Sequence, residues 1–293
     1  MPAPIHIALT ITDSFWALAY ATARSISVTS RYPADVHVHI CHEGLSPDHK
    51  AELDSIATEF GTQLHYYDIA AQPDVLAMSA ALRNTRRYPK IVYSRLLLDR
   101  ILPREIERVL YLDSDVLVLE DLTELFGTDL EGFAIGGVLD TNHIHQRLGP
   151  DLRARRNQSS QGEKWFNGGV LLQDLRKMAE ADLPAFAREL PTRMDVSKMF
   201  FDQDLANLRF THAWKRLDWR YNVMAPGAAH ISLGPVILHF TAPYKPWHLR
   251  LRRRPFARLY RHVMTNRIFY WQVKERWQKK WYLRPFTGLL PRH

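Results

Sequence analysis

Two carboxylates one residue apart, Asp113 and Asp115, interrupt an otherwise apolar segment at 109–118. Burying an unpaired carboxylate is costly, and two carboxylates at close range also repel each other. In an extended segment, residues i and i+2 point to the same side, so both side chains can bind one cation. A shared cation removes the burial cost and the repulsion together. The spacing therefore indicates a metal site at the end of a buried strand.

Strand and helix patterns alternate along the first part of the chain. Apolar or alternating runs predict strands at 5–9, 36–40 and 63–67. Apolar residues at helical spacing predict helices at 15–26 and 47–60. This alternation implies βαβ units and an α/β fold with a largely parallel sheet flanked by helices. Such sheets bind ligands beyond the carboxyl ends of their strands, which is where the aspartate pair falls.

The second half of the chain continues this pattern around a long polar stretch. We expect further strands at 133–138, 165–172 and 236–240, and a helix at 199–207. Residues 141–163 are polar, contain four arginines and show no clear periodicity. A stretch of this length without secondary structure is typical of a mobile loop or lid.

Arg95 lies within an apolar segment, 91–98, that we predict to be a buried helix. A buried guanidinium needs an anionic partner. The residues alone leave two partners open, namely a nearby acid in an ion pair or an anionic ligand.

Composition limits the class of protein. The chain has 293 residues, 46% of them hydrophobic, which supports one sizeable core. Its one cysteine, Cys41, excludes an internal disulfide and fits a reducing compartment. The first residues lack the basic region of a signal peptide, and no uncharged apolar run approaches the roughly 20 residues that span a bilayer. We therefore expect a cytoplasmic protein that is soluble or peripheral to a membrane.

The net charge of +8 is concentrated at the carboxyl end. Residues 250–293 contain 13 Lys and Arg against one acid, Glu275, whereas the preceding residues hold 26 basic and 30 acidic side chains. The 250–293 segment is also rich in aromatic residues, and a stripe recurs every four residues at Phe269, Val273, Trp277 and Trp281. Cations mixed with aromatic rings favour an anionic membrane surface.

Two other interpretations of this segment stay open. It can be a solvated, partly packed pair of helices, or a surface for nucleic acid. Nucleic acid is the weakest of the three, because no recognition motif accompanies the charge. We therefore expect a membrane partner and no nucleic acid.

Four motifs occur together, in order, and carry a family resemblance. The sequence resembles glycosyltransferase family 8, whose members have the GT-A fold, and most closely the bacterial α-galactosyl- and α-glucosyltransferases that build lipopolysaccharide or lipooligosaccharide cores. The resemblance runs from about Ile5 to about His248. The motifs are Tyr111-Leu112-Asp113-Ser114-Asp115-Val116-Leu117-Val118, Phe166-Asn167-Gly168-Gly169-Val170-Leu171-Leu172, Asp202-Gln203-Asp204, and His239-Phe240 with Lys245-Pro246-Trp247-His248.

The resemblance implies a donor site for a UDP-sugar. Asp113 and Asp115, together with His239, would coordinate a divalent ion that bridges the two phosphates. A mixed set of carboxylates and imidazole suits Mn²⁺ better than Mg²⁺, which remains the alternative ion. Lys245 would lie against the diphosphate as a point charge. Arg95 matches the family's arginine that contacts the donor.

The same resemblance places a second set of residues around the transferred sugar. Asn167, Asp202 and Gln203 would hold the sugar. The paired glycines Gly168 and Gly169 by themselves suggest close backbone approach to either a ligand or a neighbouring strand. Asp140 lies where the family contacts donor or acceptor hydroxyls.

The resemblance also implies that anomeric configuration is retained. A double displacement needs a carboxylate on the β face, but the matching position holds Gln203, a weak nucleophile. Asp204 is the nearest acid in sequence, although a helix can point it away. We therefore favour a front-face substitution in which Asp113 and Asp115 assist departure of UDP and Asp202 and Gln203 act beside the sugar.

The first loop departs from the family pattern. Family members carry two or three acids before an Asn-Tyr pair there, whereas this chain keeps only Asp13. Thr12 can still make a hydrogen bond to the uracil, and Phe15 can stack on it. We include Thr10 and Ser114, which flank the expected pocket, among the donor-binding residues.

These observations lead to one prediction of function and one alternative. We expect a GT-A catalytic domain at 1–248 and a basic, helical, membrane-associating appendage at 249–293. The predicted activity is retaining transfer of galactose or glucose from UDP to a saccharide on a glycolipid, at the inner face of the cytoplasmic membrane. The alternative is a non-catalytic sugar-nucleotide-binding or scaffolding protein of the same fold.

Overall fold

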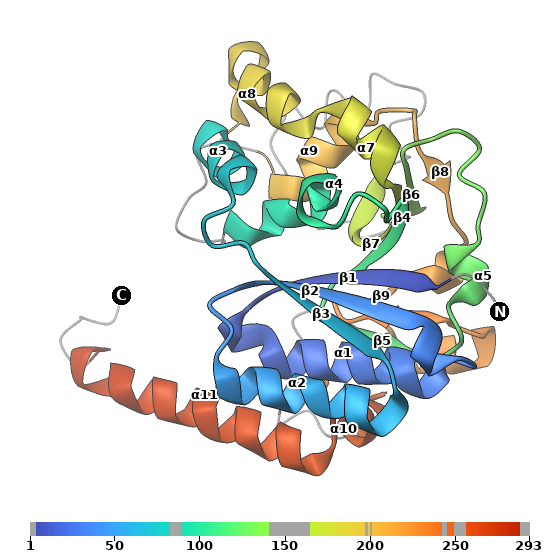
Figure 1. The fold of residues 1–293 in the computed structure, drawn as a ribbon. Helices are drawn as coiled ribbons and strands as arrows, with labels where there is room; N and C mark the ends of the chain where they lie inside the picture. Colours follow the sequence, from blue (N-terminus) through green and yellow to red (C-terminus); the bar gives the residue numbers. More distant parts are fainter. Residues whose placement is uncertain are drawn as a thin grey trace.

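The computed structural model describes residues 4–82, 90–140, 165–196, 199, 201–241, 245–248 and 256–287, with the side chains of 201 and 279–287 left out. Two helical layers enclose a central sheet, as Figure 1 shows. The predicted α/β fold with a mostly parallel sheet is therefore confirmed. The predicted lid at 141–163 lies outside the described residues, so its structure is not assigned.

The central sheet has seven strands in the order β3-β2-β1-β4-β7-β6-β8. Neighbouring strands are parallel except at β7, which is antiparallel to β4 and to β6. The carboxyl ends of β1 and β4 therefore meet at one edge of the sheet. The strands are β1 (Ile5–Thr12), β2 (Val36–Glu43), β3 (Gln63–Asp68), β4 (Arg108–Leu112), β6 (Ile135–Leu139), β7 (Phe166–Asp174) and β8 (Lys215–Arg216).

A second, three-stranded sheet brings the late part of the chain to the aspartate pair. Its strands are β5 (Val116–Val118), β9 (Val223–Met224) and β10 (Ile237–His239), in the order β5-β10-β9. β10 runs antiparallel to β5, with His239 opposite Val116. The Phe240 amide donates to the Asp115 carbonyl at 3.1 Å. This pairing places the end of β10 beside the aspartate loop.

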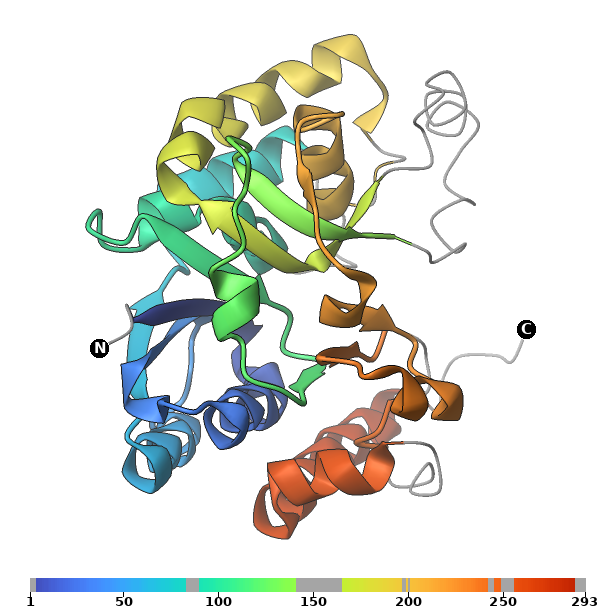
Figure 2. The ribbon, with the colours of Figure 1, turned by 90° about the vertical axis from the view of Figure 1, so that its right-hand side faces the viewer.

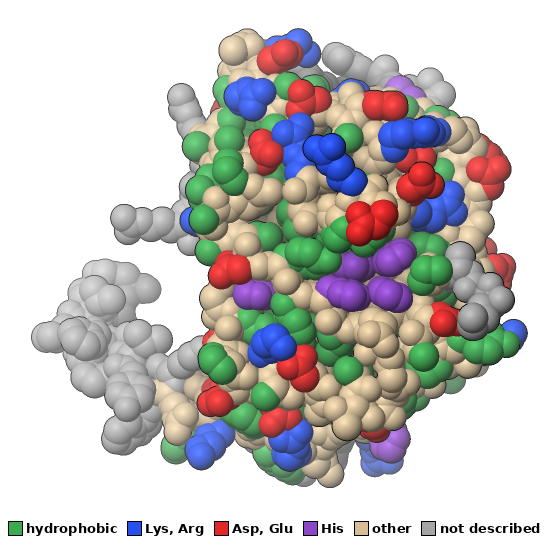
Figure 3. Space-filling view, viewed as in Figure 1, with side chains coloured by type: hydrophobic (Ala, Val, Ile, Leu, Met, Phe, Trp, Pro, Cys, Tyr) green, Lys and Arg blue, Asp and Glu red, His purple; other side chains and the backbone are tan. Residues whose placement is uncertain are grey.

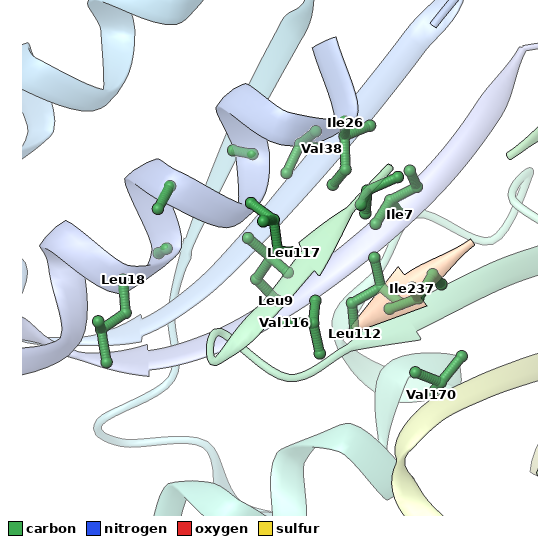
Figure 4. Packing of buried hydrophobic residues seen from close by; sticks show 14 of the residues in the cluster. Ile7, Leu9, Leu18, Ile26, Val38, Leu112, Val116, Leu117, Val170 and Ile237 are labelled. Carbon is green, nitrogen blue, oxygen red and sulfur yellow. The ribbon is translucent and has the colours of Figure 1, made fainter. Parts of the chain in front are cut away.

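One face of the central sheet packs on α1 (Trp16–Thr29) and α2 (Pro47–Phe60), and α10 (Ala257–Met264) and α11 (Asn266–Thr287) join the same core through α1. Figure 4 shows part of this core, where Leu18 and Ile26 of α1 meet side chains from several strands. The α2 helix was predicted with these bounds. It begins with Pro47 at N1 after the cap Ser46, whose side chain accepts from the His49 amide, and it ends at Gly61 with φ +78°.

The opposite face is covered by a second core and a second set of helices. These are α3 (Pro73–Ala81), the 3₁₀ helix η3 (Lys90–Leu96), α4 (Leu98–Ile101), α7 (Leu175–Ala181), α8 (Leu183–Arg193) and α9 (Phe201–Arg209). Short elements complete the described fold, namely η1 (Asp13–Phe15), η2 (Pro33–Asp35), α5 (Thr123–Phe126), η6 (Trp219–Tyr221) and η7 (Ala228–Leu233).

The segment at 91–98 differs from the single buried helix that was predicted. It forms η3 up to Leu96, and a separate α4 begins at Leu98. Burial is as expected, because Ile91 and Tyr93 face the second core. The β-branched pair Ile91 and Val92 lowers the preference for an α-helix, and a short 3₁₀ helix suits such a connecting segment.

The carboxyl-terminal helices belong to the first core. Tyr260, Met264 and Phe269 are fully buried in the same cluster as the side chains of α1. Figure 2 shows α10 and α11, in red, at the bottom of the molecule next to the blue helices α1 and α2. Within the part of the chain that is described, no helix combines the length and apolar character needed to cross a bilayer.

The aromatic stripe predicted on this segment does not form one exposed face. Phe269 is fully buried and Val273 packs against the core, whereas Trp277 is 69% exposed. The side chain of Trp281 lies outside the described residues. Four residues of an α-helix advance by about 400°, so such a stripe drifts by about 40° at each step and turns from the core towards solvent.

A cluster around His49 joins α11 to α2 and to the start of α1. His49 Nδ1 lies 2.7 Å from Asp13 Oδ1, and His49 Nε2 lies 2.8 Å from Glu275 Oε1. The imidazole stacks on Trp16 at 4.4 Å, and both Trp16 Nε1 and Trp271 Nε1 donate to Glu275. The ring of His49 therefore lies between two carboxylates, which accept hydrogen bonds from its nitrogens.

We predict that His49→Phe lowers the free energy of unfolding by about 1–3 kcal/mol. The substituted ring keeps the contact with Trp16 but removes both N–H donors, so two half-buried carboxylates lose a partner. Urea unfolding followed by tryptophan fluorescence measures the change. His262→Gln, an exposed position on α10, is the control and should change stability by less than about 0.5 kcal/mol. Equal losses in the two variants would contradict the assigned role of His49.

Candidate metal and donor site

A pocket of about 200 Å³ opens at the carboxyl ends of β1 and β4. Loop 10–15 forms one wall, η3 forms a second, and the aspartate loop closes the third. The lining residues are Thr10, Ile11, Thr12, Phe15, Ile91, Val92, Arg95, Asp113, Ser114 and Asp115. The pocket therefore combines apolar walls with two carboxylates and a guanidinium at one end.

Asp113, Asp115 and His239 converge at that end. Among the described residues, they form the one group of three or more His, Cys, Asp or Glu side chains whose ligand atoms all lie within 4.8 Å of one another. His239 Nε2 lies 3.2 Å from Asp115 Oδ1 and 3.6 Å from Asp113 Oδ2. The β5–β10 pairing is what brings the imidazole to the two carboxylates.

A chain of side-chain amides fixes the orientation of His239. Asn222 Nδ2 donates to Asn167 Oδ1 at 2.9 Å, so Asn222 Oδ1 is left to accept from His239 Nδ1 at 2.9 Å. The Nδ1 proton is therefore engaged, and Nε2 faces the carboxylates. Nε2 is therefore positioned to share a cation with the two carboxylates. The donor set and its geometry fit a divalent ion.

Gly169 is required beside this site. A Cβ at this position would lie 2.2 Å from His239 Cε1 and 2.8 Å from Asp113 Oδ2. The neighbouring Gly168 is less constrained, since its Cβ would meet Gln203 Cβ at 3.5 Å, an ordinary contact. Strand β7 thus lets the imidazole and the carboxylate close over its backbone only because residue 169 has no side chain.

Arg95 bridges the two acidic parts of the site. Its Nη1 lies 2.9 Å from Asp113 Oδ1, and its Nε lies 3.1 Å from Asp202 Oδ2. The guanidinium also lies over the Tyr111 ring at 4.7 Å, and Nη1 donates to the Gly168 carbonyl. Both partners proposed from the sequence are therefore compatible, because the guanidinium forms ion pairs and also lines the pocket.

Both polar atoms of the Gln203 side chain form hydrogen bonds. Its Oε1 accepts from the Gly168 amide at 2.9 Å and from Asn167 Nδ2 at 3.3 Å. Its Nε2 donates to Asp140 Oδ2 at 2.8 Å. The carboxamide is therefore fixed between β7 and the end of β6, beside Asp202, and it is oriented before any ligand binds.

The acids of the site differ in protonation. Burial alone would raise the pKa of Asp115, but the charges and hydrogen bonds of His239 and Lys245 outweigh burial and hold it well below its ordinary value. Lys245 Nζ lies 2.9 Å from Asp115 Oδ2. Burial, opposed in part by the charge of Arg95, raises the pKa of Asp202 to about 6. Asp115 is thus a firm anion, whereas Asp202 is the acid most ready to take up a proton.

Two residues predicted from the first loop have other contacts. Asp13 Oδ1 accepts from the Ser46 amide at 2.9 Å and contacts His49, and Asp13 does not line the pocket. Thr12 Oγ1 lies 3.0 Å from Ser14 Oγ at the pocket wall. A donor contact by Asp13 stays a prediction, and in this structure its side chain anchors the loop to α2.

Sequence reasoning missed several residues of the site, among them Ile11, which lines the pocket. Tyr111 donates to Asp113 Oδ1 at 2.7 Å and supports Arg95, and its place two residues before the aspartate was an available signal. Asn222 orients His239, but no local pattern marks it. Ile91 and Val92 line the pocket, although their apolar character predicted only burial.

Comparison with known proteins gives the family of this chain. The sequence model described as glycosyl transferase family 8 matches residues 6–250. The chain belongs to glycosyl transferase family 8. This glycosyltransferase is 24% identical over 250 residues to general stress protein A of Bacillus subtilis, covering 79% of this chain and 82% of that protein.

Two further relatives extend the comparison. The lipopolysaccharide 1,2-glucosyltransferase of Escherichia coli is 26% identical over 224 residues, which cover 72% of this chain and 63% of that protein. The solved galactosyltransferase LgtC, in complex with donor and acceptor sugar analogs, aligns with a TM-score of 0.73 and 22% identity over 89% of this chain and 95% of that one. The likeness shows that this glycosyltransferase shares the GT-A fold of LgtC.

We predict that Gly169→Ala weakens binding of a divalent ion by about tenfold or more. Mutating a residue that only orients a metal ligand already lowers metal affinity by about 10–100-fold. The added methyl group would displace His239 or Asp113. Calorimetric titration of Mn²⁺, as a probe ion, into protein mixed with UDP measures the effect. Gly168→Ala is the matched control and should keep the affinity within about threefold, since its Cβ makes an ordinary contact. Equal affinities for both variants would refute the close packing at Gly169.

Proposed function

We propose that this family 8 enzyme transfers a hexose, galactose or glucose, from a UDP-sugar to a saccharide acceptor with retention of configuration. The observation that supports this most directly is the convergence of Asp113, Asp115 and His239 at the closed end of the pocket. A nucleoside diphosphate presents a flat base and two phosphates, and the pocket offers apolar walls at one end and a cation site at the other.

The base would occupy the wall formed by loop 10–15. Phe15 is 44% exposed, and an aromatic ring left in solvent beside a pocket offers a stacking surface for uracil. Thr12 and Thr10 present hydroxyl groups on the same wall, where they can donate or accept a hydrogen bond. Asp13 would contribute indirectly, because its bonds to Ser46 and His49 hold residues 10–15 in place beside the pocket.

The diphosphate would lie at the aspartate end. Asp113, Asp115 and His239 would hold a divalent ion, and the mixed oxygen and nitrogen donors favour Mn²⁺, with Mg²⁺ as the alternative. When bound, such an ion neutralises the charge that develops on a departing phosphate. Lys245 adds a cation on the far side of Asp115, and Ser114 contributes to the pocket wall between the two ligands.

The transferred sugar would lie towards Asp202 and Gln203, with Asn167 and the Gly168 backbone beneath it. Gln203 is fixed by hydrogen bonds and is a weak nucleophile, which argues against a covalent sugar–enzyme bond at this residue. The proposal is therefore a front-face substitution, in which a phosphate oxygen of the leaving UDP takes the proton of the acceptor hydroxyl. Asp140, bonded to Gln203, would contact a sugar hydroxyl.

The acceptor would be a saccharide on a glycolipid of the lipopolysaccharide type. The named activity of the Escherichia coli relative and the basic, aromatic segment at 249–293 support this. Among the described side chains of α11, the rings of Tyr270 and Trp277 are exposed. We propose that residues 1–248 form the catalytic unit, and that this appendage places it on the inner face of the cytoplasmic membrane.

The donor assignment predicts that the full-length protein with Mn²⁺ slowly hydrolyses at least one UDP-hexose when no acceptor is present. A panel of UDP-sugars, with released UDP as the readout, identifies the donor. Asp113→Ala or Asp115→Ala should weaken calorimetric UDP binding in Mn²⁺ by more than about tenfold, because each removes a ligand of the ion. Glu180→Ala, an exposed acid on α7, is the control and should bind as the unaltered protein does.

The outcomes separate the proposed function from its alternative. UDP binding that depends on Mn²⁺ without turnover of any UDP-sugar would favour the non-catalytic binding protein. Unchanged UDP affinity in both aspartate variants would refute the metal assignment.

The membrane assignment predicts that the double variant Tyr270→Ser, Trp277→Ser binds anionic vesicles about tenfold more weakly, since two interfacial rings are lost. Point variants are needed because α10 and α11 carry core side chains. Co-sedimentation with phosphatidylglycerol vesicles measures binding. Trp219→Ser, at another exposed ring, should bind normally. Equal weakening by Trp219→Ser, or equal binding to uncharged vesicles, would contradict the assignment.

A further inference from the structure

Four histidines gather on the first three strands, away from the donor pocket. They are His6 on β1, His37 and His39 on β2, and His65 on β3. Register pairs His6 with His37 and His39 with His65 across neighbouring strands. Figure 3 shows histidine side chains forming a continuous patch on the surface over these strands. We call these four residues the histidine ladder.

The ladder contains two close nitrogen pairs. His6 Nδ1 lies 3.0 Å from His39 Nε2, and His37 Nδ1 lies 3.1 Å from His65 Nε2. The ring centroids of successive members are 4.9–5.3 Å apart around the four residues. His39 is 2% exposed and its Nδ1 lies 3.1 Å from the Tyr67 hydroxyl, whereas the other three are only half-buried.

The surroundings of His6, His37 and His39 favour the neutral form of these three rings. Burial, reinforced by the neighbouring imidazoles, lowers the pKa of His6 to about 4 and that of His39 to about 3, and it also lowers the pKa of His37. A neutral imidazole has one nitrogen with a free lone pair, which is the form that binds a metal ion. Neutral rings at His6, His37 and His39 therefore offer nitrogen ligands next to the half-buried His65.

We propose that the histidine ladder binds a divalent transition-metal ion of the Zn²⁺, Cu²⁺ or Ni²⁺ class, at a site separate from the catalytic centre. Two nitrogens that each lie about 2.1 Å from one ion are about 3.0–3.4 Å apart at bond angles near 90–110°. Both nitrogen pairs of the ladder match the short end of this range. In the absence of metal each pair is joined by a hydrogen bond, so one of its nitrogens carries a proton. When a metal ion binds, this proton moves to the other nitrogen of the same ring, where it occupies that nitrogen's lone pair, or leaves to solvent. The pair then supplies two ligands, and water or a reoriented ring of the second pair completes the coordination.

Ligand chemistry separates this site from the aspartate site. The ladder offers only imidazole nitrogen, which suits Zn²⁺, Cu²⁺ and Ni²⁺, whereas Mn²⁺ and Mg²⁺ prefer carboxylate, carbonyl and water oxygen. The ladder also lies in the first half of the strands, whereas the catalytic site lies beyond their carboxyl ends. Occupation of the ladder therefore links β1, β2 and β3 without contact to the donor pocket.

The test uses the full-length protein after removal of metals with a chelator. Zn²⁺ is titrated by calorimetry in the presence of excess Mn²⁺ and UDP, which occupy the catalytic site. We expect the unaltered protein to bind Zn²⁺, and the variant His39→Gln with His65→Gln, which breaks both pairs, to bind at least about tenfold more weakly. The matched control, His212→Asn with His262→Gln, changes two exposed histidines elsewhere and should leave Zn²⁺ binding unchanged.

Folding and catalytic controls make each result decisive. Circular dichroism checks that the ladder variant is folded. If that variant does not fold, the double variant His6→Gln with His37→Gln, which also breaks both pairs, is used in its place. Mn²⁺-dependent UDP binding should remain unchanged in the ladder variant. The proposal is overturned if the unaltered protein binds no Zn²⁺ under these conditions. It is also overturned if a folded ladder variant keeps the original affinity, or if the control variant loses as much affinity as the ladder variant.

Discussion

The repulsion between the carboxylates of Asp113 and Asp115 is the constraint on which the rest of the site depends. Two anions held near each other in a partly buried position are stable only when positive charge surrounds them. The fold answers from three directions, with Arg95 from η3, His239 from β10 and Lys245 from the chain that follows.

Much of the fold follows from local sequence. The α2 helix is specified by its own residues, because Ser46 caps it, Pro47 suits its first turn and Gly61 takes the left-handed conformation that ends it. The parallel sheet follows from the alternation of strands and helices. The aspartate pair could also be recognised locally, since the two carboxylates that repel each other lie within three consecutive residues.

What the sequence could not show depends on contacts between distant segments. Asn222 reaches the site only because β9 pairs with β10, so no pattern around Asn222 reveals its bond to His239. Helical spacing predicted that the stripe residues of α11 share one side of the helix. It could not show which part of that side other elements cover. Phe269 is buried in the first core and Trp277 is exposed, although both are aromatic residues of the same repeat.

The pairing of β5 with β10 also has a consequence for biosynthesis. The ribosome completes β1 through β5 well before it adds β10 and the helix that carries Glu275, and amino-terminal segments generally fold first. Until the last quarter of the chain arrives, the two aspartates lack His239 and Lys245. A chain that ended before β10 would therefore lack two of the side chains that surround the aspartate pair. The proposed donor site is thus completed only late in synthesis, when β10 and the residues that follow it have been added.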